Sequence, residues 1–305
     1  MAVPLTSASF ADVLDVRFRD IAMGTYDKGA SRIGDFYGVE TSDRPDERYS
    51  ELTPMGKFQQ FLGSVTYDGA EQGYDVTGTH IEWTLGLQIQ RKLYDDDQFG
   101  VIDEQFGLLG ESAFKTHEDH AAGVFSDAFS ATNSFYSHTE NVALVSNSHT
   151  TPVAGVSTAT GFDNLTTAAL SPADLSSAVV QYRQFKDAAG DWVDQQPDTL
   201  IVPVNLLDRA TEIIRTPKGL DDANLNYNVQ SGRFRIVDWI RLSDTNNWFL
   251  VNEASMKRNL LWFWRKKLEL AKMESFDNFV GKGRGYMRYS YLRRDWRWIL
   301  GAQVS

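Results

Sequence analysis

The chain has 305 residues, of which 42% are hydrophobic and 23% are charged, a composition typical of a folded globular protein rather than a disordered or fibrous one. It contains no cysteine, which excludes a disulfide framework, a thiolate zinc site, a cysteine nucleophile and an iron–sulfur cluster. The net charge of −11 argues against a protein whose main task is to bind nucleic acid phosphates.

Residues 1–50 are expected to form an extended arm, because glycine and proline interrupt the segment repeatedly. The start, Met1 to Thr6, lacks the basic segment and apolar core of a signal peptide, so we expect a cytoplasmic protein without membrane contact. One short helix is predicted between Phe10 and Ile21, where apolar residues recur at helical spacing. Such an arm stays ordered only when it lies on another surface.

A long hairpin is predicted from Phe58 to Gln90, with strands at 61–67 and 76–90 and turn residues between them. The return strand alternates apolar and polar residues from Ile81 to Gln90, which indicates one covered face and one wet face. A hairpin of this length cannot bury its own tip. More of the domain or a neighbouring subunit must therefore cover it.

A long helix is predicted next, running to about Phe129 on two rows of apolar residues at helical spacing. Asp95, Asp96 and Asp97 are expected to cap its N-terminus and to complement the helix dipole. At about 1.5 Å per residue, the helix would span roughly 45 Å.

The remainder is predicted to mix loops, helices and strands. Ser171 and Pro172 indicate the start of a helix that Gly190 ends. A final hairpin over 279–300 is expected to turn through Gly-Lys-Gly-Arg-Gly at 281–285, which would give it a basic tip. The other expected elements are short strands such as 141–145, strands at 199–202, 234–242, 248–252 and 260–273, and a helix at 204–215.

Charge is unevenly spread along the chain. Residues 231–305 hold 15 of the 30 basic residues and six of the eight tryptophans, whereas residues 95–230 hold 20 of the 41 acidic residues. The two segments are either faces that meet between subunits or parts of one solvated surface. The sequence favours neither interpretation over the other.

Candidate catalytic and metal sites are weak. His117 and His120 lie three residues apart with carboxylates between them, but no third ligand is signalled, so a solvated helix face is expected. The segment around Ser157 lacks the closing glycine of a nucleophile elbow. Carboxylate pairs with nearby aromatic residues leave a sugar site open as a less favoured alternative. Those residues are Asp191, Asp194, Asp221, Asp222, Trp192 and Trp248.

The stretch from Trp83 to Asp97 carries a resemblance to a known family. In it an apolar strand is followed by a basic pair and then by aspartates that precede the long helix. With the preceding arm and hairpin, this order resembles the major capsid proteins of tailed phages with the HK97 fold. The end of the chain, at 276–278, 289–291 and 295–298, is similar to the closing sheet of that family, nearest its Mu-like major head subunits.

The resemblance implies an α+β fold with four parts. These are an N-terminal arm at 1–51, an E-loop at 52–82, a peripheral domain at 83–140 and 233–305 with the long helix as its spine, and an axial domain at 141–232. It implies no catalytic, cofactor or metal site. Subunits would form hexamers and pentamers that tile an icosahedral shell.

The expected partners are other copies of the chain, scaffold, portal and decoration proteins, and packaged double-stranded DNA held by weak non-specific contact. Assembly is expected in the host cytoplasm, and the product is the virion capsid. No Lys lies between Lys57 and Lys92, so the covalent crosslinking of some relatives is not expected. The candidate subunit-interface residues are Phe10, Phe18, Tyr67, Asp68, Glu71, Tyr74, Arg284 and Arg294.

Two other classes stay open from the sequence. A decoration or tail subunit would assemble with another symmetry, and a carbohydrate-active β-rich protein would work as a monomer with converging carboxylates. The long hairpin and long helix argue against both, because neither class needs an element that reaches beyond its own core.

Overall fold

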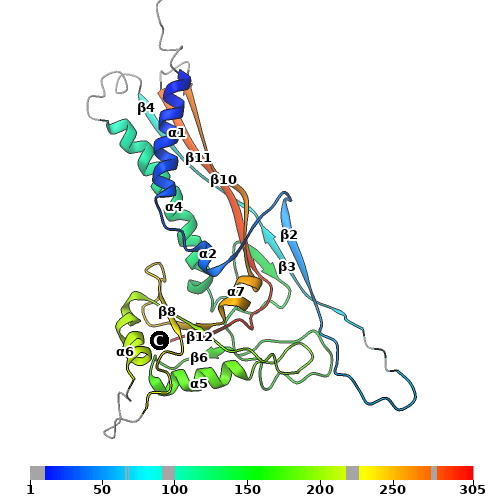
Figure 1. Ribbon diagram of the computed structural model, residues 1–305. Helices are drawn as coiled ribbons and strands as arrows, with labels where there is room; N and C mark the ends of the chain where they lie inside the picture. Colours follow the sequence, from blue (N-terminus) through cyan, green and yellow to red (C-terminus); the bar gives the residue numbers. More distant parts are fainter. Residues whose placement is uncertain are drawn as a thin grey trace, which may run out of the picture.

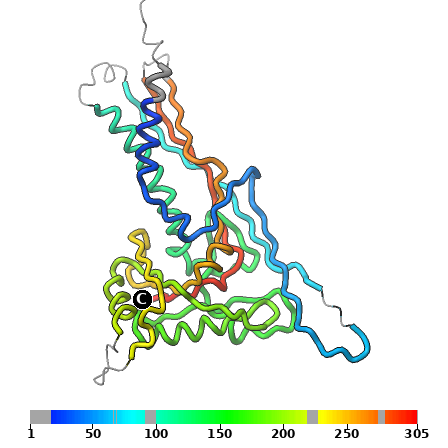
Figure 2. The backbone as a smooth tube through the Cα atoms, viewed as in Figure 1, coloured from blue at the N-terminus to red at the C-terminus, as the bar shows by residue number. Residues whose placement is uncertain are grey.

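The molecule has an upright limb, a broad base and a loop that projects sideways (Figures 1 and 2). The computed structural model describes residues 11–65, 67, 69–90, 100–217, 227–275 and 280–304. The limb carries two helices on a four-stranded sheet, the base carries a five-stranded sheet with helices, and a three-stranded sheet leads to the projecting loop.

The limb sheet has the strand order β1-β10-β11-β4. Its two longest strands are β10 (Leu260–Ser275) and β11 (Val280–Arg293), with β1 (Gly38–Thr41) parallel to β10 and β4 (Ile81–Gln90) antiparallel to β11. Along β4 the alternation predicted from the sequence is confirmed, because Trp83, Leu87 and Ile89 are half-buried and the residues between them are exposed. One face of this sheet is therefore covered.

The covering helices are α1 (Ala11–Asp27) and α4 (Val101–Ser126), which pack against each other. Phe18 of α1 stacks on Phe106 of α4 with ring centroids 4.5 Å apart. The helices approach closely at Gly110, where a Cβ atom would lie 2.1 Å from the carbonyl oxygen of Ala22. The arm is thus largely helical and packed on its own chain, which corrects the expectation of an extended arm.

The predicted turn at 281–285 is wrong, because these residues lie inside β11 and pair with both β10 and β4. Glycine there serves close packing rather than reversal of the chain. A Cβ atom on Gly283 would lie 2.8 Å from the ring of Phe106, so the spine helix can rest on the strand only where side chains are missing.

The predicted hairpin is also displaced along the chain. Its paired strands are β2 (Asp46–Leu52) and β3 (Gln72–Thr79), and β5 (Tyr136–His138) adds a third strand to β3. The described residues of 61–67 form no strand. The sequence pattern predicts the first strand of the hairpin at 61–67 instead of 46–52. Residues 46–52 are rich in charged residues and lack the apolar alternation that indicates a strand.

The base sheet has the order β6-β12-β9-β7-β8. Its central strands, β7 (Thr199–Val202), β9 (Trp248–Val251) and β12 (Ile299–Ala302), are buried throughout. The edge strands are β6 (Leu165–Thr166) and β8 (Arg235–Asp238). Three helices accompany the sheet, namely α5 (Pro172–Arg183), the 3-10 helix η2 (Val204–Leu206) and α6 (Leu207–Arg215).

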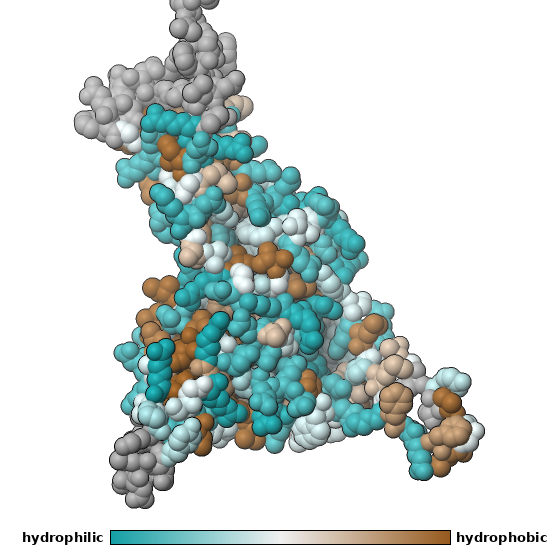
Figure 3. All heavy atoms as spheres, in the orientation of Figure 1, coloured by the Kyte–Doolittle hydropathy of each residue, from teal (hydrophilic) through white to brown (hydrophobic). Residues whose placement is uncertain are grey.

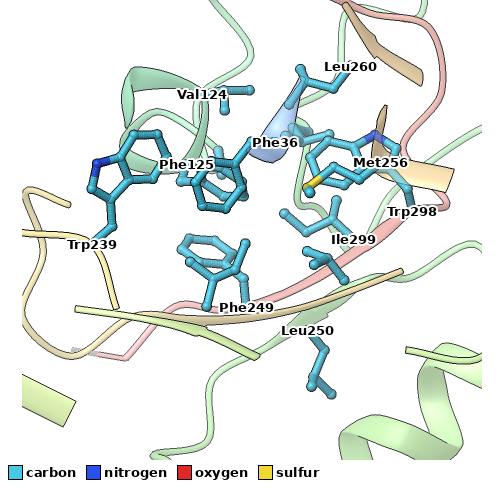
Figure 4. Close-up of a cluster of buried hydrophobic side chains, with 14 of the residues drawn as sticks. Phe36, Val124, Phe125, Trp239, Phe249, Leu250, Met256, Leu260, Trp298 and Ile299 are labelled. Carbon is cyan, nitrogen blue, oxygen red and sulfur yellow. The ribbon is translucent and has the colours of Figure 1, made fainter. Parts of the chain in front are cut away.

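Limb and base share one core at the point where they meet (Figure 4). The limb contributes side chains of α4 and the start of β10, and the base contributes β9 and β12. Between them lie α2 (Ile33–Phe36) and α7 (Glu253–Asn259). The residues labelled in Figure 4 are Phe36, Val124, Phe125, Trp239, Phe249, Leu250, Met256, Leu260, Trp298 and Ile299.

Several predicted boundaries need correction. The N-cap of α4 is Gly100, which makes no side-chain capping bond, and Asp95–Asp97 lie outside the described residues. The α5 helix starts at Ser171 and Pro172 as predicted but ends at Arg183, seven residues before Gly190. Residues 141–145 form no strand, and the strand predicted at 234–242 is reduced to β8.

Candidate functional site

The most conspicuous surface feature is the loop of residues 53–71, which projects from the end of the β2–β3 ladder (Figure 1). The ladder ends at the pair Leu52 and Gln72. Beyond it Thr53 closes the loop, because its amide donates to the Glu71 carbonyl at 2.9 Å and its hydroxyl accepts from the Glu71 amide at 2.8 Å. The base of the loop is therefore fixed to the end of the ladder.

The loop carries apolar side chains that the described part of the chain leaves uncovered. Figure 3 shows hydrophobic atoms gathered on it. The exposed fractions of seven large side chains lie between 62% and 108%, whereas soluble proteins bury most such groups. The set comprises Leu52 at the end of β2 and, on the loop itself, Met55, Phe58, Phe61, Leu62, Val65 and Tyr67. A contiguous apolar surface of this kind indicates a site that another surface covers.

Two contacts tie the loop and its stem to the base. Lys57 forms an ion pair with Asp191, and the Tyr74 hydroxyl lies 2.6 Å from the Thr150 hydroxyl. Beside them the Glu51 carboxylate accepts from the Tyr74 amide at 3.4 Å. Burial, with the negative charge of Asp295 as a further cause, raises the pKa of Glu51.

A buried hydrogen-bond cluster lies at the other end of the stem, where β3 passes into β4. The two ring nitrogens of His80 lie 3.0 Å from the Ser42 hydroxyl and 2.8 Å from the Ser290 hydroxyl, and Ser42 donates to Glu47 at 2.5 Å. Because Ser42 gives its proton to the carboxylate, Nε2 of His80 donates to Ser42 and Nδ1 accepts from Ser290. Burial lowers the pKa of His80, which keeps this neutral arrangement near pH 7.

The histidines on the spine helix are structural. His117 and Glu118 are buried, so the expected solvated helix face is wrong there. Burial alone would raise the pKa of Glu118, but hydrogen bonds from His117, Ser31 and the Arg32 amide hold it below its ordinary value. Glu118 thus fixes the chain between α1 and α2 to α4. Across the described ranges, no group of three His, Asp or Glu residues is arranged to hold a metal ion.

Among the described residues predicted as a sugar site, Trp248 is not on the surface and Asp191 is already paired. Trp248 is fully buried in β9, which corrects its assignment as an exposed aromatic. Trp192 is exposed and lies beneath the Lys186 ammonium at 5.3 Å, while Asp191 is paired with Lys57. Asp221 and Asp222 lie outside the described residues.

The structure separates the predicted interface residues into distinct positions. Phe10 and Asp68 lie outside the described residues, and Phe18 is buried against Phe106 in the chain's own limb. Tyr67 is 92% exposed on the projecting loop. The others lie on the stem and the limb: Glu71 and Tyr74 at the foot of the loop, Arg284 exposed on β11, and Arg294 exposed with its guanidinium 5.1 Å from the Tyr49 ring centre.

Sequence reasoning found Tyr67 but missed three other exposed apolar residues of the loop. The predicted strand at 61–67 includes Phe61 and Leu62, and Phe58 begins the predicted hairpin, whereas all three stand on a segment without regular structure. The available signal was the spacing, because apolar residues at 55, 58, 61, 62 and 65 do not alternate as a strand requires.

Within the part of the chain that the structure describes, no helix is long and apolar enough to cross a membrane.

Comparison with known proteins gives a consistent result. Residues 74–301 match a family model described as phage capsid protein. No curated protein sequence matches the chain.

Solved structures share the fold at low sequence identity. A virus-like particle from Pyrococcus furiosus is 11% identical, with 95% of this chain and 99% of that chain covered and a TM-score of 0.51. The mature capsid of bacteriophage PhiM1 is 12% identical, with 91% and 88% covered and a TM-score of 0.58. The capsid of Cyanophage P-SCSP1u is 14% identical, with 90% and 88% covered and a TM-score of 0.57.

Proposed function

We propose, from the premise that this chain belongs to the phage capsid protein family, that its subunits join into a closed shell through the projecting loop 53–71. The α+β, HK97-like fold expected from the sequence is confirmed, and so is the role of a major capsid protein, a structural subunit that forms a shell. The Mu-like subtype stays a prediction.

One observation carries the role of the loop, namely its uncovered apolar side chains. Burying apolar surface stabilises a contact by roughly 25 cal/mol per Å² removed from water. In a lone subunit the loop stays exposed to water. A neighbouring subunit that covers the loop gains the free energy of burying its apolar side chains. The loop is therefore a device for association rather than for stability of the single chain.

The proposal extends to the form of the shell and its contents. Subunits form hexamers and pentamers in an icosahedral shell around double-stranded DNA, assembled in the host cytoplasm. The net charge of −11 supports weak, non-specific contact with packaged DNA, because like charges keep the DNA from adhering. Scaffold, portal and decoration proteins are further proposed partners, and we propose that the subunit has no catalytic activity.

The division of the chain is likewise proposed as an arm at 1–51, an E-loop at 52–82, a peripheral domain at 83–140 and 233–305, and an axial domain at 141–232. The position of the loop between β2 and β3 supports the second of these parts. The base sheet combines strands from both larger parts. Its strands β6 and β7 belong to the axial domain, and they pair with β8, β9 and β12 of the peripheral domain.

The test replaces residues 54–70 by a short Gly-Ser turn. We expect a folded subunit that no longer closes shells, because the replacement leaves the β2–β3 ladder and the Thr53–Glu71 closure in place. Electron microscopy at matched concentrations measures shells, and circular dichroism checks the fold. Normal particles from the shortened chain would refute the role given to the loop.

A further inference from the structure

A buried chain of hydrogen bonds runs from the end of β5 to the base sheet. At its start, one carboxylate oxygen of Glu140 lies 2.9 Å from Nδ1 of His149 and accepts from the Thr150 amide at 3.0 Å. Nε2 of His149 lies 3.2 Å from the side-chain oxygen of Asn164, the residue directly before β6. The exposed fractions of the His149 and Glu140 side chains are 0% and 1%, so water does not screen the contact between them.

The orientation of the Asn164 side chain is fixed by the groups around it. Its NH2 group donates to the carbonyls of Leu144 at 2.9 Å and Ile299 at 3.1 Å, and its oxygen accepts from the Ser146 amide at 2.8 Å. An exchange of oxygen and nitrogen would place the NH2 group against an amide donor and the oxygen against two carbonyls. The atom that faces His149 is therefore an oxygen, which only accepts.

Both ring nitrogens of His149 thus face acceptors, namely an amide oxygen and a carboxylate oxygen. A neutral imidazole carries one N–H and would leave one of these buried acceptors without a donor, whereas the doubly protonated ring satisfies both. The ring also lies flat on the Trp296 indole, with centroids 4.1 Å apart and planes inclined by 5°. A cation is favoured in that position over an aromatic face.

We propose that Glu140 and His149 form a buried ion pair, and that this pair is a proton-dependent connection between the stem of the loop and the base. The stem is the sheet of β2, β3 and β5, which leads from the projecting loop to the body, and Glu140 lies two residues beyond β5 (Figure 1). On the base side, Asn164 holds Ile299, the first residue of β12. The pair belongs to the single subunit and does not depend on shell formation.

Other charged groups surround the pair. A cavity of about 10 Å³, close to the size of one water molecule, lies beside Glu140. Its other titratable or charged lining residues are Glu51, Tyr74, His138, Arg294, Asp295 and Arg297. Burial alone would raise the pKa of Glu140, but the hydrogen bonds from His149 and from the Thr150 amide, with the positive charge of Arg293, hold that pKa below its ordinary value. The carboxylate therefore stays charged, as the pair requires.

Each partner sets one limit of the pH range in which the pair exists. The stability that Glu140 contributes is present above pH 4.5 and is lost as the pH falls below that value. The unfolded chain releases the second histidine proton near pH 6.5, whereas the folded chain retains it. The stability that His149 contributes is therefore present below pH 6.5 and declines as the pH rises. This dependence is opposite to that of His138, whose pKa burial lowers to about 4.

Magic-angle-spinning NMR of protein labelled with ¹⁵N in histidine tests the charge directly, in shells and in single subunits alike. At about pH 7.5 we expect both ring nitrogens of His149 to carry a proton, whereas His138 keeps one bare nitrogen. The signals that disappear in His149→Gln assign the resonances of His149. A bare nitrogen on His149 in the wild-type protein at this pH would overturn the proposal, and this measurement needs no variant to fold perfectly.

Two carboxyl substitutions of equal size test the connection. Glu140→Gln keeps an oxygen for the His149 ring and the Thr150 amide but removes the charge, so we expect a bare nitrogen to appear on His149 at the same pH. Glu51→Gln is the matched control, because Glu51 lines the same cavity, and there His149 is expected to keep both protons.

Hydrogen exchange of the β3 and β5 amides, measured at one pH for all three proteins, reports how firmly the stem is held. We expect exchange to quicken by about tenfold in Glu140→Gln and to stay unchanged in Glu51→Gln. Equal exchange in the three proteins would overturn the role of the pair as a connection between stem and base.

Discussion

At the scale of single residues, some aromatic side chains of the molecule are buried in its core and others are exposed on its surface. Phe106 is buried between α1 and the limb sheet, and Phe58 is fully exposed on the loop. Removal of a buried phenylalanine leaves a cavity, whereas truncation of an exposed one changes the folded subunit little. The same substitution therefore separates folding from assembly.

We predict that Phe106→Ala lowers the free energy of unfolding of the subunit by about 3–5 kcal/mol. Phe58→Ala is expected to change it by less than about 0.5 kcal/mol while reducing the yield of shells. Chemical denaturation of the isolated subunit and electron microscopy measure the two effects. A large loss of stability in Phe58→Ala would contradict the assignment of that residue to an interface.

His138 on β5 couples stability to pH. Its Nδ1 accepts from the Glu140 amide at 3.2 Å, and burial, with the positive charge of Arg293, lowers its pKa to about 4. The unfolded chain binds a proton near pH 6.5 while the folded chain does not, so the stability that His138 contributes is present above pH 6.5 and is lost as pH falls toward 4.

The expected loss across this window is about 3 kcal/mol for His138, to which other titrating groups add. In His138→Asn, whose side-chain oxygen can still accept from Glu140, this component is absent and the decline between pH 7 and pH 4.5 becomes shallower. Denaturation curves of both proteins at several pH values measure the difference. Parallel declines would show that His138 is not held neutral by the fold.

At the scale of elements, the contact between α1 and α4 depends on glycine. A Cβ atom on Gly110 would lie 2.1 Å from the Ala22 carbonyl oxygen, whereas one on Gly107 meets its nearest atom, the Thr25 hydroxyl, at 3.5 Å. Both glycines lie on the same helix, so alanine gains similar helix propensity at each. The pair isolates the effect of close packing.

We predict that Gly110→Ala moves α1 away from α4 and costs about 1–3 kcal/mol, which exceeds its gain in propensity. Gly107→Ala is expected to be neutral or to stabilise by up to about 1 kcal/mol. Thermal unfolding together with limited proteolysis of α1 tests both. Equal effects of the two substitutions would show that α1 does not pack on α4 at this distance.

Elements with strong local signals could be predicted, and those that depend on distant contacts could not. Ser171 and Pro172 indicate the start of α5, where the Ser171 hydroxyl accepts from the Asp174 amide, and the short apolar run at β7 is a fully buried strand. The glycines at 281–285 resemble a turn, but their role is set by Phe106, about 175 positions away in the sequence. Local patterns do not contain that information.

At the scale of the whole molecule, the burial of apolar surface is incomplete. Limb and base share a continuous aromatic core (Figure 4), while the apolar side chains of the loop stay uncovered by the described part of the chain. The family resemblance could be reached from the order of elements, because an arm, a ribbon and a spine helix follow each other in the sequence. The apolar tip of the loop became evident only when the remaining contacts of the fold were known.

The most direct test of the account is negative-stain electron microscopy of the purified, concentrated protein, with mass photometry of the same sample. We predict closed shells, or rings of five and six subunits, that disappear when residues 54–70 are replaced by a short turn. A uniform monomer near 34.4 kDa at every concentration, with or without the loop, would contradict the central claim that exposed apolar surface on this loop drives assembly.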